Sequence, residues 1–201
     1  MRHVLIAMVF VVAALGAARA ETLQTAIFAG GGFWCVEADF DAVPGVVDTL
    51  SGYTGGDLED PSYDRVSRED TGHYEAVRIT FDAETVTYAQ LLHVFWRSID
   101  PTDAAGQFCD RGPSYRTAVF VLDADQAALA ETSRQQARDR LGQEIVTPIL
   151  AAKTFWPAEA HHQNFHETNP LRYSFYREAC GRDARVRQLW GADALILEER
   201  P

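Results

Sequence analysis

Positive charge, cysteine and long apolar runs are all scarce in this sequence. Its 201 residues include 18 Lys and Arg against 29 Asp and Glu, which gives a formal net charge of -11. Nucleic-acid binding depends on basic surfaces that neutralise phosphates, so a nucleic-acid partner is not expected. Three cysteines are too few for a disulfide scaffold, so the stability of the fold must come from a hydrophobic core. Their odd number leaves at least one thiol free, modified or bonded to another chain.

The one apolar run long enough to consider as a membrane anchor stands near the N-terminus. Arg2 and His3 precede an uncharged stretch over residues 4–17, and Ala18-Arg19-Ala20 follows it. The stretch is short for a bilayer-spanning helix. Small residues at positions 18 and 20 are typical of signal-peptidase cleavage, so residues 1–20 are predicted to be a secretory signal peptide cleaved after Ala20. The mature protein would then be secreted or periplasmic and not held by a membrane.

No internal repeat, low-complexity tract or linker interrupts residues 21–201, which favours a single domain. Apolar periodicity and turn residues predict strands and helices in the order β-α-β-β-α-β, followed by further helices. The expected strands are 25–29, 46–53, 74–81, 117–122 and 145–150, and the expected helices are 33–41, 88–97, 123–141, 158–166 and 183–196. This order predicts an α+β protein, a two-layer α/β sandwich with a ferredoxin-like (split βαβ) core.

The segment from Gly30 to Glu37, GGGFWCVE, joins a predicted strand to a helix N-terminus through three glycines. Free backbone N–H groups at such a terminus favour an anion and lower the pKa of a thiol. Phe33 and Trp34 could hold a small apolar group beside a reactive atom. Taken alone, a tight turn with two core aromatics explains the segment equally well.

Further segments resemble the peptide methionine sulfoxide reductase A family, in the order in which that family carries them. The resemblance extends from about residue 25 to residue 183. The matching segments are SGYTGG (51–56), PSY (61–63), TGHYEAV (71–77), DPTD (100–103), QFCDRG (107–112), SYR (114–116), FWPAE (155–159) and NP (169–170).

The resemblance implies a thiol mechanism, and Gly32 occupies the position of the family's nucleophilic cysteine. In the family, that thiolate attacks the sulfoxide sulfur and becomes a sulfenic acid. A second cysteine then forms a disulfide with it, and an external thioredoxin-like reductant restores both thiols without a further cofactor or a metal. Glycine has no side chain and cannot perform this chemistry.

The resemblance also assigns roles to the other site residues. It implies that Phe33 and Trp34 hold the S-methyl group of the substrate. Glu75 would donate a proton to the sulfoxide oxygen, which requires burial to raise its pKa. Hydrogen bonds to the same oxygen would come from two hydroxyls, and a nearby carboxylate would orient the site. These three groups correspond to Tyr63, Tyr115 and Asp110.

The three cysteines leave several arrangements open. Cys35 lies three residues after Gly32 on the same helix face, so it is a candidate stand-in thiol. Cys180 matches the family's resolving cysteine. Cys109, beside Asp110, is more simply interpreted as a small buried residue, although it too is a candidate stand-in. Cys180 could therefore pair with Cys35 or with Cys109, or remain free.

Two polar segments, around His162 and over residues 182–187, are interpreted as solvent-facing surface and not as binding sites. His162 and His166 have i, i+4 spacing, but no cluster of Cys or carboxylate ligands accompanies them. They are taken as a polar helix face and not as a metal site. The run 182–187, RDARVR, is interpreted as a solvated basic end of the chain.

The function implied by the resemblance is that of a peptide-methionine (S)-S-oxide reductase. Its substrates would be exported proteins that contain methionine-S-sulfoxide and free methionine sulfoxide, and the protein would act as a monomer with a thioredoxin-like donor. Gly32 leaves an alternative, a relative that binds methionine sulfoxide without reducing it.

Overall fold

The computed structural model describes residues 22–195, so the predicted signal peptide lies outside the described residues. Strands, α-helices and short 3-10 helices (η) follow one another along these residues. The order is β1 (Leu23–Gly30), α1 (Phe33–Asp41), β2 (Val46–Thr54), α2 (Tyr63–Val66), β3 (Tyr74–Asp82), α3 (Tyr88–Ser98), β4 (Gly106–Gln107), β5 (Asp110–Arg111), η1 (Pro113–Tyr115), β6 (Thr117–Val121), α4 (Ala124–Leu141), β7 (Ile149–Ala151), β8 (Trp156–Pro157), η2 (Ala160–His162), α5 (Phe165–Thr168), α6 (Pro170–Ala179), α7 (Arg182–Trp190) and η3 (Gly191–Asp193).

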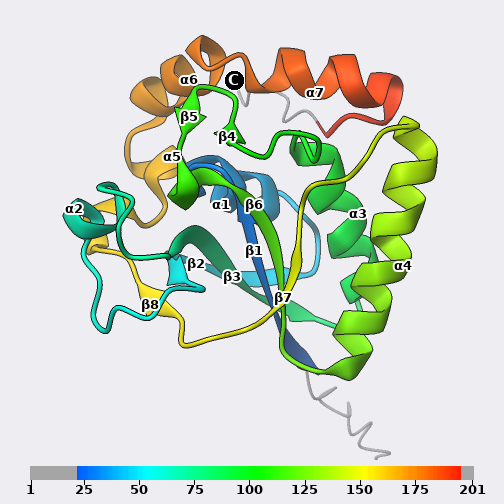
Figure 1. Cartoon of the computed structure of the whole chain (residues 1–201), viewed down its shortest axis with the longest axis horizontal. Helices are drawn as coiled ribbons and strands as arrows, with labels where there is room; N and C mark the ends of the chain where they lie inside the picture. The colour runs from blue at the N-terminus through cyan, green and yellow to red at the C-terminus, as the bar shows by residue number, and fades with distance from the viewer. Residues whose placement is uncertain (1–21, 196–201) are drawn as a thin grey trace, which may run out of the picture.

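A six-stranded mixed sheet in the order β7-β6-β1-β3-β2-β8 forms the centre of the molecule (Figure 1). Its strand pairs are antiparallel except β6 and β7, which are parallel. Strand β3 lies between β1 and β2 and is antiparallel to both, so β1 and β2 run in the same direction and α1 connects them. The inner order β6-β1-β3-β2, with α3 between β3 and β6, confirms the predicted split βαβ core of an α+β fold.

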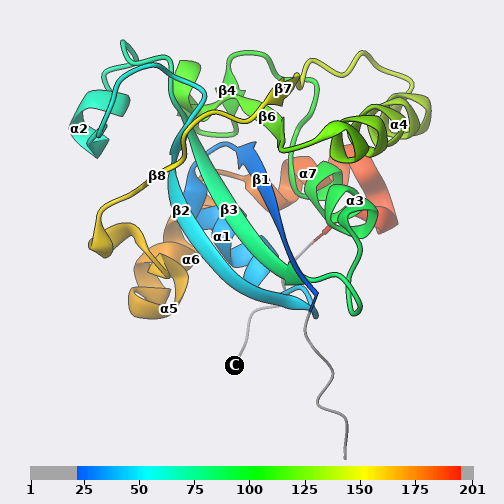
Figure 2. The same ribbon diagram turned by 90° about the horizontal axis from the view of Figure 1, so that it is seen from below.

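Helices α1 and α3 cover one face of the sheet and form the main core with it. Phe28 of β1 stacks on Phe40 of α1 and on Phe95 of α3, with ring centroids 5.3 and 4.8 Å apart. The segment between β7 and β8 passes over the other face of the sheet (Figure 2), where Ala152 and Phe155 pack against a smaller apolar cluster that includes Phe120. The end of β1 and the start of α1 are therefore held firmly from both sides.

The structure departs from the expected elements at four main points. The strand expected at 145–150 is limited to Ile149–Ala151. The helix expected at 158–166 is split into η2 and α5, because Asn164 adopts a left-handed conformation with φ 50°. Helix α6 was not predicted, since its apolar residues Leu171 and Phe175 are 88% and 74% exposed and give no buried stripe. Helix α7 stops at Gly191, where φ is 60°, instead of continuing to residue 196.

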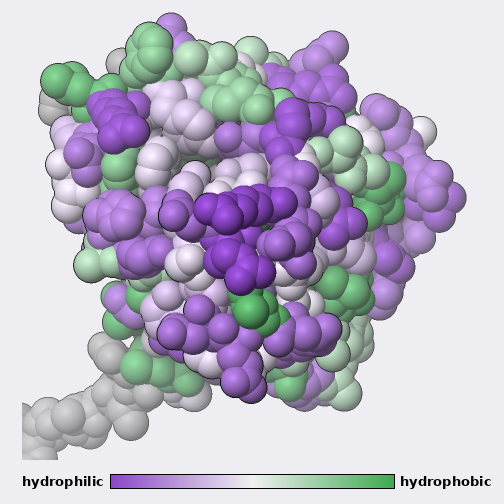
Figure 3. All heavy atoms as spheres, turned by 60° about the vertical axis from the view of Figure 1, so that its left-hand side comes forward, coloured by the Kyte–Doolittle hydropathy of each residue, from purple (hydrophilic) through white to green (hydrophobic). Residues whose placement is uncertain are grey.

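The surface is predominantly hydrophilic on the side where α2 and α6 lie. Figure 3 shows hydrophilic side chains over most of this face, with hydrophobic residues in small separate groups. Single exposed apolar residues of this kind are normal on folded proteins. Between residues 22 and 195, every helix is too short or too polar to cross a bilayer.

Candidate active site

In the turn between β1 and α1, the structure requires glycine at position 31 but not at position 32. Gly31 has φ 92°, and a Cβ atom there would lie 2.6 Å from the Cβ of Gln107, so both backbone and space require glycine. Gly32 is the N-cap of α1, with φ -57° and ψ 124°, which any L-residue can adopt. A side chain at position 32 is thus compatible with the backbone, in contrast to one at position 31.

The space that a side chain at position 32 would enter is filled by two polar groups. An ideal Cβ on Gly32 would lie 2.7 Å from the hydroxyl of Tyr176 and 2.8 Å from Oδ2 of Asp110. The Tyr176 hydroxyl donates a hydrogen bond to this same Oδ2. Burial raises the pKa of Asp110, whereas the hydrogen bond from Tyr176 and the charge of Arg182 act in the opposite direction. Both groups are ends of side chains, so they can move aside more readily than backbone.

Glu75 of β3 is a buried carboxyl group aimed at the start of α1. It is 3% exposed, and its Oε2 accepts a hydrogen bond from the backbone N–H of Phe33 at 3.0 Å. Burial raises its pKa to about 8, the Phe33 amide opposes this, and the charge of Asp110 adds to it. At neutral pH, Glu75 is therefore mostly protonated and can donate a hydrogen bond or a proton.

Tyr63 and Tyr115 bring two hydroxyl groups to the same place from α2 and η1. Burial raises the pKa of both, and each hydroxyl acts on the pKa of the other. Ionised Glu75 would raise the pKa of both tyrosines further, so its carboxyl lies within electrostatic range of the two hydroxyls. At neutral pH both phenols keep their protons, so they are donors for a substrate oxygen.

Glu159 positions Tyr63 and was not singled out by the sequence analysis, although it belongs to the FWPAE segment. Its Oε1 accepts from the backbone N–H of Tyr63 at 2.8 Å, and its Oε2 accepts from the hydroxyl of Tyr53 at 2.9 Å. One carboxylate thereby ties the start of α2 to strand β2. Charge-assisted hydrogen bonds of this kind fix geometry well.

An aromatic cluster completes the site, and His162 is an unexpected member of it. Trp34 stacks on Phe165 with ring centroids 3.7 Å apart, and its Nε1–H donates to Nδ1 of His162 at 3.2 Å. The His162 ring lies 5.1 Å from Phe33 and 4.6 Å from Tyr63. His162 is 3% exposed, so its interpretation as part of a polar helix face is wrong. Burial lowers its pKa, and the neutral ring accepts from Trp34 and fixes that indole.

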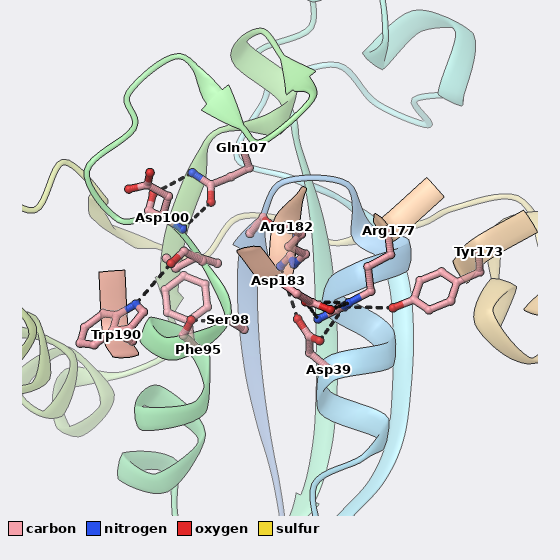
Figure 4. A network of polar contacts seen from close by, with 12 residues as sticks. Asp39, Phe95, Ser98, Asp100, Gln107, Tyr173, Arg177, Arg182, Asp183 and Trp190 are labelled. Carbon is pink, nitrogen blue, oxygen red and sulfur yellow. Dashed lines mark hydrogen bonds and ion pairs between the residues drawn. The ribbon is translucent and has the colours of Figure 1, made fainter. Parts of the chain in front are cut away.

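A buried ionic network lies beneath the glycine turn (Figure 4). Arg182 of α7 is 2% exposed, donates to the carbonyl oxygen of Gly30 at 3.2 Å and pairs with Asp39 of α1 at 3.4 Å. Arg177 of α6 pairs with the same Asp39 at 2.8 Å. The prediction of a solvated basic end is therefore wrong for Arg182, which links the last helix to the turn that carries Gly32.

The cysteines are arranged in one of the ways that the sequence left open. Cys109 and Cys180 form a disulfide, with Cα atoms 4.8 Å apart. Cys109 is exposed, so its interpretation as a small buried residue is wrong. Cys35 is free and 3% exposed, and it packs beside Ala38 and Phe165. Burial raises the pKa of the Cys35 thiol, which reduces its thiolate fraction and makes it a poor stand-in nucleophile.

The structure thus brings together every side chain that the resemblance placed around a sulfoxide group. The residues so gathered at the N-terminus of α1 are Phe33, Trp34, Tyr63, Glu75, Asp110 and Tyr115. A protonated acid and two phenols beside an aromatic cluster form a site for a small group with an acceptor oxygen and an apolar end. Cys35 lies next to this site and not in it, and Cys180 is held against Cys109.

Comparison with known proteins identifies the family of this fold and site. The family model described as Peptide methionine sulfoxide reductase matches residues 24–194, so the chain belongs to the peptide methionine sulfoxide reductase family. The chain is 52% identical over 174 residues to Peptide methionine sulfoxide reductase MsrA 2 of Rhizobium meliloti (strain 1021), with 87% of each chain covered.

Two further relatives agree with this assignment. The chain is 50% identical over 196 residues to Peptide methionine sulfoxide reductase MsrA 2 of Caulobacter vibrioides, with 95% of this chain and 100% of that protein covered. Among solved structures, methionine sulfoxide reductase A of Corynebacterium diphtheriae has a TM-score of 0.69 and 28% identity, over 77% of this chain and 78% of the other.

Proposed function

We propose that this protein reduces methionine-S-sulfoxide to methionine, in proteins and as the free amino acid, with electrons from a thioredoxin-type dithiol. The observation that carries the proposal is the protonated Glu75 beside the hydroxyls of Tyr63 and Tyr115 at the N-terminus of α1. Membership of the family and relatives at about half identity support it.

The site supplies what sulfoxide reduction needs on the oxygen side. Phe33 and Trp34 would hold the S-methyl group against their rings, and the hydrogen bond from Trp34 to His162 fixes the indole for this contact. The hydroxyls of Tyr63 and Tyr115 would bind the sulfoxide oxygen, and Glu75 would transfer a proton to it. Protonation draws electrons from the S–O bond, so the sulfur becomes electrophilic and open to attack by a thiol.

The electron side needs a thiol, and position 32 does not provide one. Reduction of a sulfoxide to a thioether takes two electrons, which a pair of thiols supplies by becoming a disulfide. We propose that Gly32 occupies the family's nucleophile position. The residue leaves the backbone there in a conformation that accepts cysteine, while Tyr176 and Asp110 fill the space.

Turnover driven by dithiothreitol tests the proposal. The protein and its Gly32→Cys variant are incubated with the separated S and R epimers of methionine sulfoxide, and the methionine produced is measured. We expect consumption of the S epimer alone, at a higher rate in the Gly32→Cys variant, because that change places a thiol at a helix N-terminus beside Glu75. Failure of both proteins to reduce either epimer would contradict the proposed function.

The binding alternative has a distinct outcome in the same experiment. If the unchanged protein binds a sulfoxide peptide in calorimetry but produces no methionine, while Gly32→Cys produces it, the natural protein is a binder of methionine sulfoxide.

We also propose that the protein acts as a secreted or periplasmic monomer after cleavage of the signal peptide behind Ala20. The support is the pattern of residues 1–20 in the sequence. Intact mass of the exported protein should correspond to a chain that begins at Glu21, and light scattering should give the mass of one chain. A mass that includes residues 1–20 would contradict the cleavage.

A further inference from the structure

We propose that Cys109 is the nucleophilic thiol of this protein and that Cys180 is its resolving partner. This inference rests on the proposed function, and it assigns the two-electron step to residues of this chain. Three observations support it: the disulfide lies beside Gly32, the disulfide is accessible from the surface, and the third cysteine, Cys35, is buried.

Asp110 connects the vacated position 32 with the sulfur of Cys109. Its Oδ2 lies 2.8 Å from the ideal Cβ position on Gly32, and its Oδ1 lies 3.7 Å from Sγ of Cys109. The Asp110 carboxylate therefore lies between the Cys109 sulfur and the position that a side chain at residue 32 would occupy. Asp110 also acts electrostatically on Glu75, Tyr63 and Tyr115, so the same carboxylate lies within electrostatic range of the acid and the two phenols.

The disulfide is open to partners from the outside. It lines a cavity of about 440 Å³ together with Phe108, Asp100 and Arg185. Cys109 itself is exposed. An external dithiol can thus reach the disulfide.

Cys35 does not compete for this role. Its sulfur is buried among apolar side chains, and its pKa is raised by that burial. The pair Cys109–Cys180 is the disulfide present in the described part of the chain, and it already joins two sulfurs in the relation that nucleophile and resolving thiol require.

Reduction of the disulfide also releases the groups that fill the space beside Gly32. Tyr176 and Cys180 lie four residues apart at the end of α6, and Asp110 follows Cys109 directly. The disulfide therefore holds together the two segments that carry Tyr176 and Asp110. Once it is cleaved, the segment of Asp110 is freer to move, while Arg177 and Arg182 still pair with Asp39 and hold the segment of Tyr176, so Cys109 can turn toward the sulfoxide.

The proposed cycle balances in atoms and electrons. The Cys109 thiol loses its proton and attacks the sulfoxide sulfur, Glu75 protonates the oxygen, and the hydroxyl passes to Cys109 as the thioether leaves. This gives methionine and Cys109 sulfenic acid, and the proton lost by the thiol restores Glu75. The Cys180 thiol then attacks the sulfenic sulfur, water departs, and the Cys109–Cys180 disulfide forms. An external dithiol reduces this disulfide and becomes oxidised itself.

A single-turnover experiment tests this assignment. The unchanged protein and its variants Cys109→Ser, Cys180→Ser and Cys35→Ala are reduced, freed from reductant and mixed with methionine-S-sulfoxide. We expect one methionine per chain from the unchanged protein, from Cys35→Ala and from Cys180→Ser, and none from Cys109→Ser. In Cys180→Ser, dimedone should label Cys109, since its sulfenic acid has no partner.

A double variant separates failure of this assignment from failure of the proposed function. Gly32→Cys combined with Cys109→Ser should form methionine again, which shows that loss of Cys109 leaves the fold and the Glu75 site intact. If Cys109→Ser alone forms as much methionine as the unchanged protein, the assignment is wrong and the reductase function stands. If the unchanged protein is inert while the double variant is active, the assignment is again wrong. Inactivity of every protein would overturn both.

Discussion

The replacement Glu75→Gln tests the central claim about the site, namely that a neutral carboxyl group is buried beside the helix N-terminus. Glutamine keeps an oxygen that can accept from the Phe33 amide, which Glu75 now binds at 3.0 Å, and it cannot ionise. The folded-state pKa of about 8, against an ordinary value of 4.5, corresponds to about 5 kcal/mol at roughly 1.36 kcal/mol for each pKa unit.

The sign of the pH effect follows from the raised pKa of Glu75. Below pH 4.5 the carboxyl is protonated in the folded and the unfolded chain, so its stabilising effect is fully present. Between pH 4.5 and 8 the unfolded chain loses the proton while the folded chain retains it, and the free energy of unfolding falls. Between pH 5 and pH 8, the unchanged protein should therefore lose about 3 to 4 kcal/mol relative to Glu75→Gln.

Urea unfolding followed by tryptophan fluorescence at pH 5 and pH 8 measures this difference, and Glu37→Gln serves as the matched control. Glu37 of α1 is also buried, and burial raises its pKa to about 7, but it is not one of the side chains gathered around the proposed sulfoxide site. Both variants should flatten the pH dependence of stability. Only Glu75→Gln should lower turnover, which in the unchanged protein declines as pH rises above about 8. If Glu75→Gln and the unchanged protein lose the same unfolding free energy between these pH values, the buried neutral carboxyl is refuted.

Further predictions concern the surroundings of the site. Arg182→Met leaves Asp39 with one cation fewer and the Gly30 carbonyl without its donor, so thermal unfolding should reveal a loss of about 3–5 kcal/mol; an unchanged melting temperature would show that the pair contributes nothing. Trp34→Ala removes the ring proposed to contact the S-methyl group, so kcat/KM for the sulfoxide should fall about 10- to 100-fold. A constant kcat/KM would mean that the methyl group binds elsewhere. The free energy of unfolding of Gly32→Cys should lie within about 1 kcal/mol of that of the unchanged protein, because the backbone at position 32 suits cysteine and the displaced Tyr176–Asp110 hydrogen bond contributes about that much. A larger loss in urea unfolding would indicate that the side chains of Tyr176 and Asp110 cannot move.

The parts of the fold that could be predicted from the sequence are those with a strong local pattern. The helix at 33–41 has the bounds expected, because the glycines before it and the Pro44-Gly45 pair after it both stop regular structure. Strand β3 and helix α3 differ from prediction by one residue at one end, since alternation and an apolar stripe are unambiguous there. Helix α4 begins directly after Asp123, the first residue of the expected helix, whose side chain caps it by accepting from the backbone N–H of Gln126.

The features that could not be predicted depend on contacts distant in sequence. Arg182 lies in a run of charged residues that is typical of a solvated surface, and only its packing beneath Gly30 reveals its role. Histidine has no periodic signature of burial, so the position of His162 against Trp34 required the tertiary structure. The partner of Cys180 lies 71 residues away, and no spacing rule selects Cys109 over Cys35 at that distance.

The contact between Arg182 and the Gly30 carbonyl has a consequence for truncated forms of this protein. A chain shortened to end before residue 182 would retain the whole sheet and every side chain around Glu75, yet it would lack the guanidinium that supports the turn from below. Proteolysis within α6 or α7 should therefore abolish activity while the rest of the protein is still folded. An affinity tag attached beyond residue 195 leaves the contact between Arg182 and Gly30 in place.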